Sequence, residues 1–380
     1  MPCGCFRPRA RQRGEFMAIE INKAKELVIR AGHELQETGL IARTWGNISA
    51  RISKTQFVIT PSGLAYDTLT PDKIVPVNIK DLSWEGDVKP SSEKGVHAAA
   101  YALRPDVDFV IHTHQDYATD MAAIAKPLNV AKIDPEAEAV LGPVVPTAGY
   151  GLSSTKTLTE NVRKCIDTHK NSRAVLMRNH GTVCMGKDYD DAFNIAHVLE
   201  KVSKKKFLEL AGGAAPEDTV PGYRLSNYSK IYRREIHEEY DAFYEIFDNP
   251  KVGCVIVTTA PWIRQYSAFG SRLVPCVDDI AQIIGMNIPC IRGDASPKEI
   301  AKALPGDTAA VLLKGVGAVC TAGSLDDAGA VVCVLDKGCQ AGILEKAGAH
   351  PHAVSFAAGN LEHMIYVNKY SKLKDSKQKA

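Results

Sequence analysis

Three histidines have the types and spacing that suit a metal ion: His112, His114 and His180. His112 and His114 follow the apolar run 109–111, which predicts a short buried strand. Because alternate residues of a strand point to the same side, the two imidazoles would project together. His180 lies in an Asn-His-Gly turn after a second apolar segment. Three protein ligands leave a position open on a divalent ion, as in catalytic sites. The competing interpretation is a surface His-x-His pair without a metal.

A second group of candidate residues, Ser91, Ser92 and Glu93, lies where a helical pattern begins. Serines at this place normally cap a helix, and a glutamate in the first turn suits the helix dipole. The same arrangement of a helix N-terminus and two hydroxyls also suits a phosphate group. Glu93, if it lies beside the metal, could act as a base. Both interpretations stay open from these residues alone.

Two dipeptides, Gly46-Asn47 and Ser62-Gly63, are of the kind that forms turns. A turn is their ordinary interpretation. Glycine also lets the backbone approach an anion closely, so these residues and the two serines could together form a phosphate pocket.

The elements that must position these residues alternate between helical and strand patterns. The fold class is therefore α/β, with a mostly antiparallel central sheet and helices on its faces. We expect helices over about 18–39, from Ser91 to about 103, after Ser154 and over 188–210, and strands over 48–52, 57–60, 109–111, 173–177 and 182–185.

The second half of the chain repeats the first. Residues 174–184 match residues 310–320 without a gap, at a constant offset of 136 that persists to residues 201 and 337. Residues 110–114 have a weaker counterpart in 256–260. In this alignment His112, His114 and His180 are replaced by Thr258, Ala260 and Val316. The second copy lacks a clear counterpart of the Gly46-Asn47 and Ser62-Gly63 segment. It is a shortened, degenerate copy without metal ligands.

Composition and length set the remaining expectations. The 380 residues, 45% of them hydrophobic, suffice for one large or two medium domains. A net charge of +2 indicates no nucleic-acid or membrane partner. The ten cysteines do not form a disulfide framework, and several lie in apolar runs, which predicts a cytoplasmic protein. We predict a leader over 1–16, a catalytic domain over 17–212, a linker over 213–228, the degenerate domain over 229–362 and a basic tail over 363–380.

The order of these motifs over roughly residues 20–210 resembles the class II aldolase/adducin family. The resemblance implies a three-layer fold, a zinc ion on the three histidines and a catalytic role for Glu93. It also implies a phosphate pocket made by Gly46, Asn47, Ser62, Gly63, Ser91 and Ser92. His97, which lies near these residues, is not a ligand in the family pattern, and we interpret it as a packing or supporting residue.

The function that the resemblance implies is metal-dependent cleavage of a ketose phosphate to dihydroxyacetone phosphate and an aldehyde. The cofactor would be Zn²⁺, with Mn²⁺ or Co²⁺ as alternatives, and the partner a small sugar phosphate. The family implies homo-oligomers with sites between subunits, so a chain with two copies would form a dimer that mimics a tetramer. The alternatives are a pentulose-phosphate 4-epimerase or sugar-phosphate dehydratase on the same site, or an adducin-like non-catalytic protein.

Overall fold

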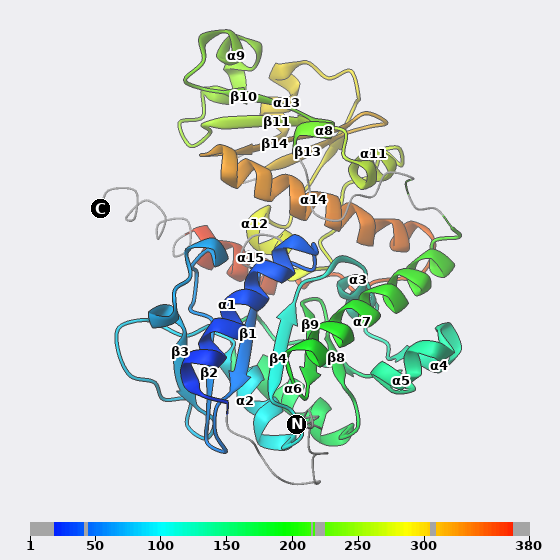
Figure 1. The fold of residues 1–380 in the computed structure, drawn as a ribbon. Coiled ribbons are helices and arrows are strands. Elements are labelled where there is room, and N and C mark those ends of the chain that lie inside the picture. Colours follow the sequence, from blue (N-terminus) through cyan, green and yellow to red (C-terminus); the bar gives the residue numbers. More distant parts are fainter. Residues whose placement is uncertain (1–18, 42–44, 214–215, 217–224, 305–308, 368–380) are drawn as a thin grey trace, which may run out of the picture.

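The computed structural model describes residues 19–41, 45–213, 216, 225–304 and 309–367, which form two α/β units, one above the other in Figure 1. The first unit contains a seven-stranded sheet with the strand order β3-β2-β1-β4-β9-β8-β7. All neighbours are antiparallel except β7 and β8. The strands are β1 (Gly46–Arg51), β2 (Gln56–Ile59), β3 (Val75–Asn78), β4 (Phe109–Thr113), β7 (Thr147–Ala148), β8 (Ala174–Met177) and β9 (Gly181–Gly186).

Helices cover both faces of this sheet, so the first unit has three layers. Successive residues of β4 point to opposite faces of the sheet. Ile111 packs in one apolar core with residues of α1, α3 and α7. Val110 packs in the other core with residues of α2 and α6. The predicted three-layer fold with a mostly antiparallel sheet is confirmed. The helices are α1 (Ile21–Glu37), α2 (Lys94–Leu103), α3 (Asp116–Ile124), α6 (Lys156–Thr168) and α7 (Tyr189–Leu210).

The predicted elements begin and end close to the observed ones because their caps are local. The carboxylate of Glu20 accepts hydrogen bonds from the first turn of α1, and that of Asp188 does the same for α7. Gly39, just past α1, has a φ of 71°, which suits glycine at a helix end.

The turn predicted at Gly46-Asn47 is wrong. Both residues lie in β1, where Gly46 pairs with Thr113 and Asn47 pairs with His112. Gly46 has a φ of 137°, and a Cβ atom on it would lie 2.7 Å from the carbonyl oxygen of His112. The glycine therefore allows β1 to approach β4 closely at the end of the strand.

The second unit contains a five-stranded sheet with the order β10-β11-β14-β13-β12, which corresponds to β1-β4-β9-β8-β7. Counterparts of β2 and β3 are absent from its described residues, so the copy is shortened as predicted, although β10 does correspond to β1. Its strands are β10 (Ser229–Arg233), β11 (Cys254–Thr258), β12 (Cys290–Ile291), β13 (Ala310–Leu313) and β14 (Gly317–Ala322). Its helices are α9 (His237–Ala242), α10 (Tyr244–Phe247), α11 (Pro261–Ser267), α12 (Asp278–Ile283), α13 (Pro297–Ala303), α14 (Leu325–Lys346) and α15 (Phe356–Ile365).

The strand register corrects the predicted alignment of the two copies by one residue. On β4, His112 pairs with Val183, and on β11, Val257 pairs with Val319. Since Val183 and Val319 are equivalent at the offset of 136, the counterpart of His112 is Val257 and not Thr258. In the same register Thr259, not Ala260, corresponds to His114. The conclusion that the second copy lacks the histidines is unchanged.

The remaining elements are short. They are β5 (Leu128–Asn129), β6 (Val144–Val145), α4 (Val130–Ile133), α5 (Glu138–Leu141), α8 (Leu225–Tyr228) and three single 3₁₀ turns, Tyr66–Thr68, Pro71–Lys73 and Pro135–Ala137.

The predicted boundaries can be compared with the elements only in part. β10 begins at Ser229, the first residue of the predicted second domain. α15 continues to Ile365, so it crosses the predicted start of the basic tail at 363. The predicted leader, most of the linker and most of the tail lie outside the described residues.

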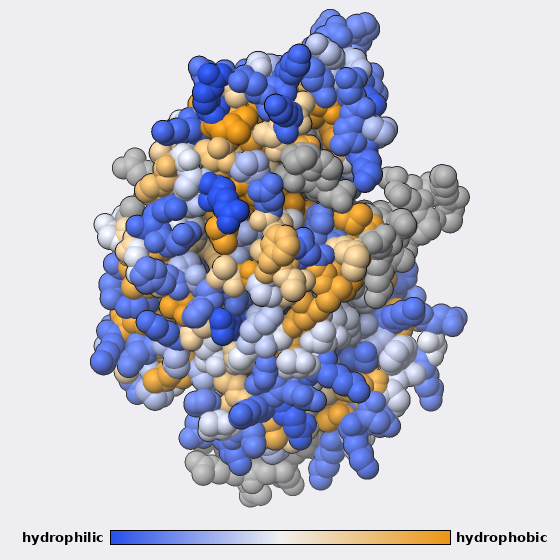
Figure 2. All heavy atoms as spheres, turned by 180° about the vertical axis from the view of Figure 1, so that it is seen from behind, coloured by the Kyte–Doolittle hydropathy of each residue, from blue (hydrophilic) through white to orange (hydrophobic). Residues whose placement is uncertain are grey.

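The two units share an apolar core, which runs from α3 and α7 of the first unit to α11 and α14 of the second. The view from behind in Figure 2 shows apolar side chains gathered near the middle of the molecule. α15, which lies at that height in Figure 1, exposes Phe356, Leu361 and Met364. Within the described ranges, every helix is too short or too polar to cross a lipid bilayer.

Candidate metal centre

The structure brings the three predicted ligands together. His112 is part of β4, His114 follows that strand, and His180 lies in the turn between β8 and β9. Because β9 pairs with β4, the turn before β9 lies beside the end of β4. The Nε2 atoms of His112 and His114 are 2.9 Å apart, and one nitrogen from each ring lies within 4.8 Å of the others. All three side chains are buried.

The other ring nitrogen, Nδ1, donates a hydrogen bond in every case, which defines the tautomers. The acceptors are the Thr182 carbonyl oxygen for His112 at 2.8 Å, the Asp279 carboxylate for His114 at 2.8 Å and the Asp278 carboxylate for His180 at 3.2 Å. The Nε2 atoms therefore turn toward a common point. His180 Nε2 is buried, and the Glu93 carboxylate lies next to it. Facing nitrogen lone pairs are stabilised by a cation, so these residues fit a divalent metal with nitrogen ligands.

Glu93 lies at the same point, directly before α2. Its Oε2 is 3.0 Å from His112 Nε2, and its Oε1 is 3.0 Å from His180 Nε2. Burial alone would raise the pKa of Glu93, but the neighbouring rings of His180 and His112 outweigh it and hold that pKa well below its usual range. The carboxylate is thus available as a proton acceptor beside the metal position.

A chain of hydrogen bonds holds Glu93 from the interior. Tyr101 and Ser49 are 2.7 Å apart at their hydroxyl oxygens, and the Ser49 hydroxyl donates to His97 Nδ1 at 2.6 Å. His97 Nε2 donates to Asn47 Oδ1 at 2.5 Å, and Asn47 Nδ2 donates to Glu93 Oε2 at 3.2 Å. Burial lowers the pKa of His97 to about 3, so its ring is neutral. These contacts agree with the supporting role predicted for His97.

The residues of the predicted phosphate pocket lie around one cavity. An isolated bridge between Pro61 and Pro90 brings the Ser62-Gly63 turn next to Ser91 and Ser92. The cavity, of about 1960 Å³, is lined by all six of those residues together with Glu93, His114 and His180. The amide of Asn47 is already bonded to His97 and Glu93, so it supports the carboxylate. Phosphate binding by these six residues stays a prediction.

Several residues at this site have no motif in the sequence. Asp278, Asp279 and Glu362 come from the second unit, and Ser153, whose hydroxyl donates to Glu93 Oε1 at 3.3 Å, comes from the loop before α6. Burial raises the pKa of Glu362 to about 8, with the charge of Asp278 adding to it. The sequence contains Asp278 and Asp279 as an adjacent acidic pair, but nothing near this pair in the sequence relates it to His114.

Electrostatic effects differ between the two carboxylate–histidine pairs. Burial lowers the pKa of His114 to about 4, although Asp279 opposes this shift. Burial would also lower the pKa of His180, but Glu93 and Asp278 on either side of the ring raise it well above its usual value. The metal position is therefore surrounded by negative charge, which favours a cation.

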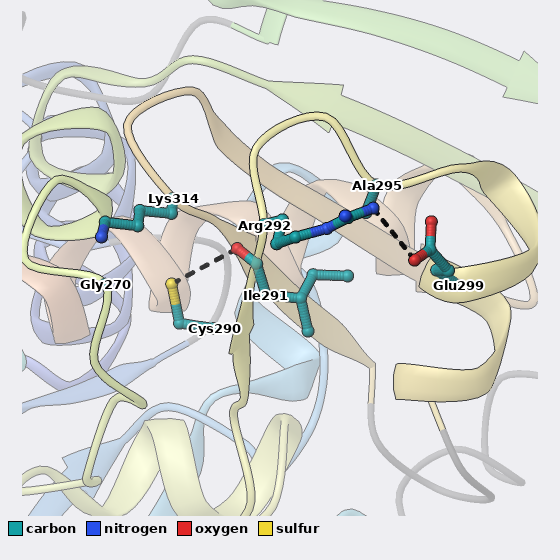
Figure 3. A pocket seen from close by; sticks show the side chains of 7 residues that line it. All are labelled: Gly270, Cys290, Ile291, Arg292, Ala295, Glu299 and Lys314. Carbon is teal, nitrogen blue, oxygen red and sulfur yellow. Dashed lines mark hydrogen bonds and ion pairs between the residues drawn. The ribbon is translucent and has the colours of Figure 1, made fainter.

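A smaller cavity of about 460 Å³ lies in the second unit and is lined by Cys290, Arg292, Glu299 and Lys314 among others (Figure 3). Arg292 turns to Glu299, at 3.1 Å, and away from Lys314. This cavity has no set of metal ligands. In the described part of the chain the three histidines are the single group of that kind.

The chain is similar to one protein family and to several solved structures. The model of the class II aldolase and adducin N-terminal domain matches twice, over residues 26–206 and 218–343, one match for each unit. Among solved structures, the chain is similar to an L-fuculose 1-phosphate aldolase, with 33% identity and a TM-score of 0.46 over 52% of this chain and 91% of that one. It is also similar to L-fuculose-1-phosphate aldolase from Thermus thermophilus (26% identity, TM-score 0.43, 52% and 99% covered). A third similar structure is the sugar-phosphate aldolase from Thermotoga maritima (20%, 0.44, 52% and 98%).

Proposed function

The chain belongs to the class II aldolase and adducin family, and we propose that it is a metal-dependent aldolase. The reaction is cleavage of a ketose phosphate to dihydroxyacetone phosphate and an aldehyde. The observation that carries the proposal is the meeting of three histidine Nε2 atoms with the Glu93 carboxylate in one cavity.

His112, His114 and His180 would hold the metal, and Zn²⁺ suits three imidazole ligands best, with Mn²⁺ or Co²⁺ as alternatives. When bound, the metal supplies Lewis-acid stabilisation of the negative charge that develops on the substrate oxygens.

The chain's own residues bind the substrate and move the proton. Ser62, Gly63, Ser91 and Ser92 would hold the phosphate at the N-terminus of α2, where the helix dipole favours an anion. In cleavage, the hydroxyl group on the carbon that becomes the aldehyde loses its proton from oxygen. The carbon–carbon bond then breaks, and its electron pair goes to the dihydroxyacetone phosphate fragment. A proton is then added to the carbon retained by the dihydroxyacetone phosphate fragment. Glu93 takes and returns a proton in this sequence, held in place by Asn47 and Ser153.

The test is turnover by the full-length chain loaded with Zn²⁺ on a panel of ketose 1-phosphates and 5-phosphates. Release of dihydroxyacetone phosphate from at least one substrate is the expected result. The Glu93→Gln variant should keep one metal per chain and lose roughly 10²–10⁴-fold in turnover, the usual contribution of a positioned acid–base group. A His112→Ala/His114→Ala variant that retains its full metal content would contradict the metal site.

A second candidate function, a pentulose-phosphate 4-epimerase, is favoured by Glu362. This residue lines the same cavity, accepts a hydrogen bond from Ser153 N at 3.2 Å, and its buried Oε2 lacks a partner among the described residues. An epimerase requires a second acid–base group of the protein that can reach the substrate. Epimers of a pentulose 5-phosphate, formed without triose phosphate, would support this function over cleavage. Absence of both metal and turnover would instead favour an adducin-like binding protein.

A further inference from the structure

Two carboxylates of the second domain lie directly behind two of the metal-site histidines. Asp278 and Asp279 begin α12, and both are almost completely buried. Asp279 accepts the Nδ1–H hydrogen bond of His114 with both oxygens, at 2.8 and 2.9 Å. Asp278 accepts that of His180 at 3.2 Å.

A carboxylate on the outer nitrogen of a metal-binding histidine does three things. It selects the tautomer with a free Nε2, fixes the ring orientation and makes Nε2 more basic. In the first domain itself, only His112 finds such an acceptor among the described residues, the carbonyl oxygen of Thr182. His114 and His180 depend on residues 165 and 98 positions further along the chain.

We infer that the second domain, whose described residues include no metal-ligand group of their own, completes the metal centre of the first domain through Asp279 and Asp278. Both act as positioning residues for His114 and His180. The inference rests on the proposed metal site and extends it, because it makes the affinity of that site a property of both domains.

The contacts around the two carboxylates hold them in place. The backbone N–H of Asp278 donates to the carbonyl oxygen of Asn179, at 2.8 Å, next to His180 itself. Lys337 of α14 donates to the carbonyl oxygen of His114 at 2.5 Å, and its Nζ is 3.7 Å from Asp279 Oδ2. A buried carboxylate is costly without such a partner. The second domain therefore supplies the carboxylates together with the cation and backbone contact that stabilise their placement.

The experiment measures binding of Co²⁺ alone to the full-length chain after its metal has been removed with a chelator. Competition with a chromophoric chelator gives the Kd, and the visible absorption of Co²⁺ reports the ligand geometry. We expect Asp279→Asn to raise the Kd by about 10–100-fold, the usual loss when a supporting partner is removed. Asp278→Asn should have a smaller effect in the same direction, because its hydrogen bond is longer.

Asp336→Asn is the matched control. Asp336 belongs to the second domain and accepts the backbone N–H of Ile263, but it does not contact a histidine of the metal site. The Kd of the Asp336→Asn variant for Co²⁺ should equal that of the unmodified chain. Circular dichroism and thermal unfolding without metal show whether each variant folds, and Asp278→Asn tests the same inference if Asp279→Asn does not fold.

The outcomes separate this inference from the proposed function. Tight Co²⁺ binding by the unmodified chain, with an unchanged Kd in both folded aspartate variants, would overturn the inference and leave the metal site standing. A folded, unmodified chain that binds no Co²⁺ would overturn the metal site itself. A Kd that rises about tenfold or more in Asp279→Asn, with no rise in Asp336→Asn, would support the inference.

Discussion

Asn179, beside His180, shows how one residue can both shape a turn and join the domains. It has a φ of 62°, and its counterpart in the second copy is Gly315, with a φ of 71°. The turn therefore needs the left-handed conformation in both copies, and glycine would suffice for that purpose. Asparagine adds an amide, whose Nδ2 donates to the carbonyl oxygens of Cys276 at 2.8 Å and His352 at 2.5 Å.

We predict that Asn179→Gly keeps the turn but weakens the domain contact. The variant loses one buried and one partly buried hydrogen bond, and it removes the donor from two carbonyl oxygens. The free energy of unfolding should fall by roughly 2–4 kcal/mol in denaturant titration. His350→Gly is the control, because His350 also has a positive φ, 52°, but is exposed. Its effect should stay within about 0.5 kcal/mol. Equal effects of both variants would contradict a special role for the Asn179 amide.

Among the secondary-structure elements, both copies begin one helix in the same way: a carboxylate of a long helix accepts hydrogen bonds from the first backbone N–H groups of that helix. Glu200 on α7 accepts hydrogen bonds from the backbone N–H groups of Tyr117 and Ala118, at 2.9 and 3.0 Å, at the start of α3. Asp336 on α14, its counterpart, accepts from Ile263 N at 3.1 Å at the start of α11. A side chain from a long helix thus replaces the usual N-cap.

These two carboxylates make stability depend on pH. Burial raises the pKa of Glu200 and that of Asp336 to about 7 in the folded chain, from usual values near 4. A folded-state pKa above the unfolded value means that the stabilising contribution is complete below about pH 4 and is lost as pH rises through about 7. The free energy of unfolding should therefore fall by on the order of a few kcal/mol per group between about pH 4 and about pH 7.

We predict that Asp336→Asn flattens this dependence. Between about pH 5 and 8 the free energy of unfolding should fall less steeply in the variant than in the unmodified chain, because one of the groups with a raised pKa is gone. Denaturant titrations at several pH values measure the slopes. Asp294→Asn, which removes an exposed carboxylate of the same domain, should leave the slope unchanged. Parallel slopes for Asp336→Asn and the unmodified chain would refute the assignment.

At the scale of the whole molecule, one surface is covered in the first copy and open in the second. The turn at Asn179 is covered by residues 276–278 of the second domain. The equivalent turn of the second copy, at Gly315, carries Val316, which is 41% exposed. This turn lies beside the small cavity that Lys314 lines. Because the equivalent position is an interface in the first copy, this is where a contact between chains would be expected.

We propose that two chains associate through this surface. Sedimentation equilibrium should give about twice the 41.2 kDa mass of one chain. Val316→Glu should shift the equilibrium toward single chains, because it places a charge in the contact. Four chains or one chain per particle would contradict the assembly, and a Val316→Glu protein that stays fully paired would place the contact elsewhere.

The local elements, the repeat and the candidate ligand set could be predicted from the sequence alone. The strand pattern before His112 and His114 and the serines before α2 are local signals, since periodicity and capping depend on neighbours a few residues apart. The loss of His180 in the second copy was also readable, because the ungapped match required no structure.

The register between the copies and the hydrogen-bond partners of the histidines became visible in the three-dimensional structure. The short apolar strand β11 fits its counterpart almost equally well at neighbouring positions, so the pairing of Val257 with Val319 had to be observed. The approach of Asp279 to His114 spans 165 residues and depends on how two domains pack. Such a contact leaves no periodic or spacing signal in the chain, because it arises from the shape and burial of both surfaces together.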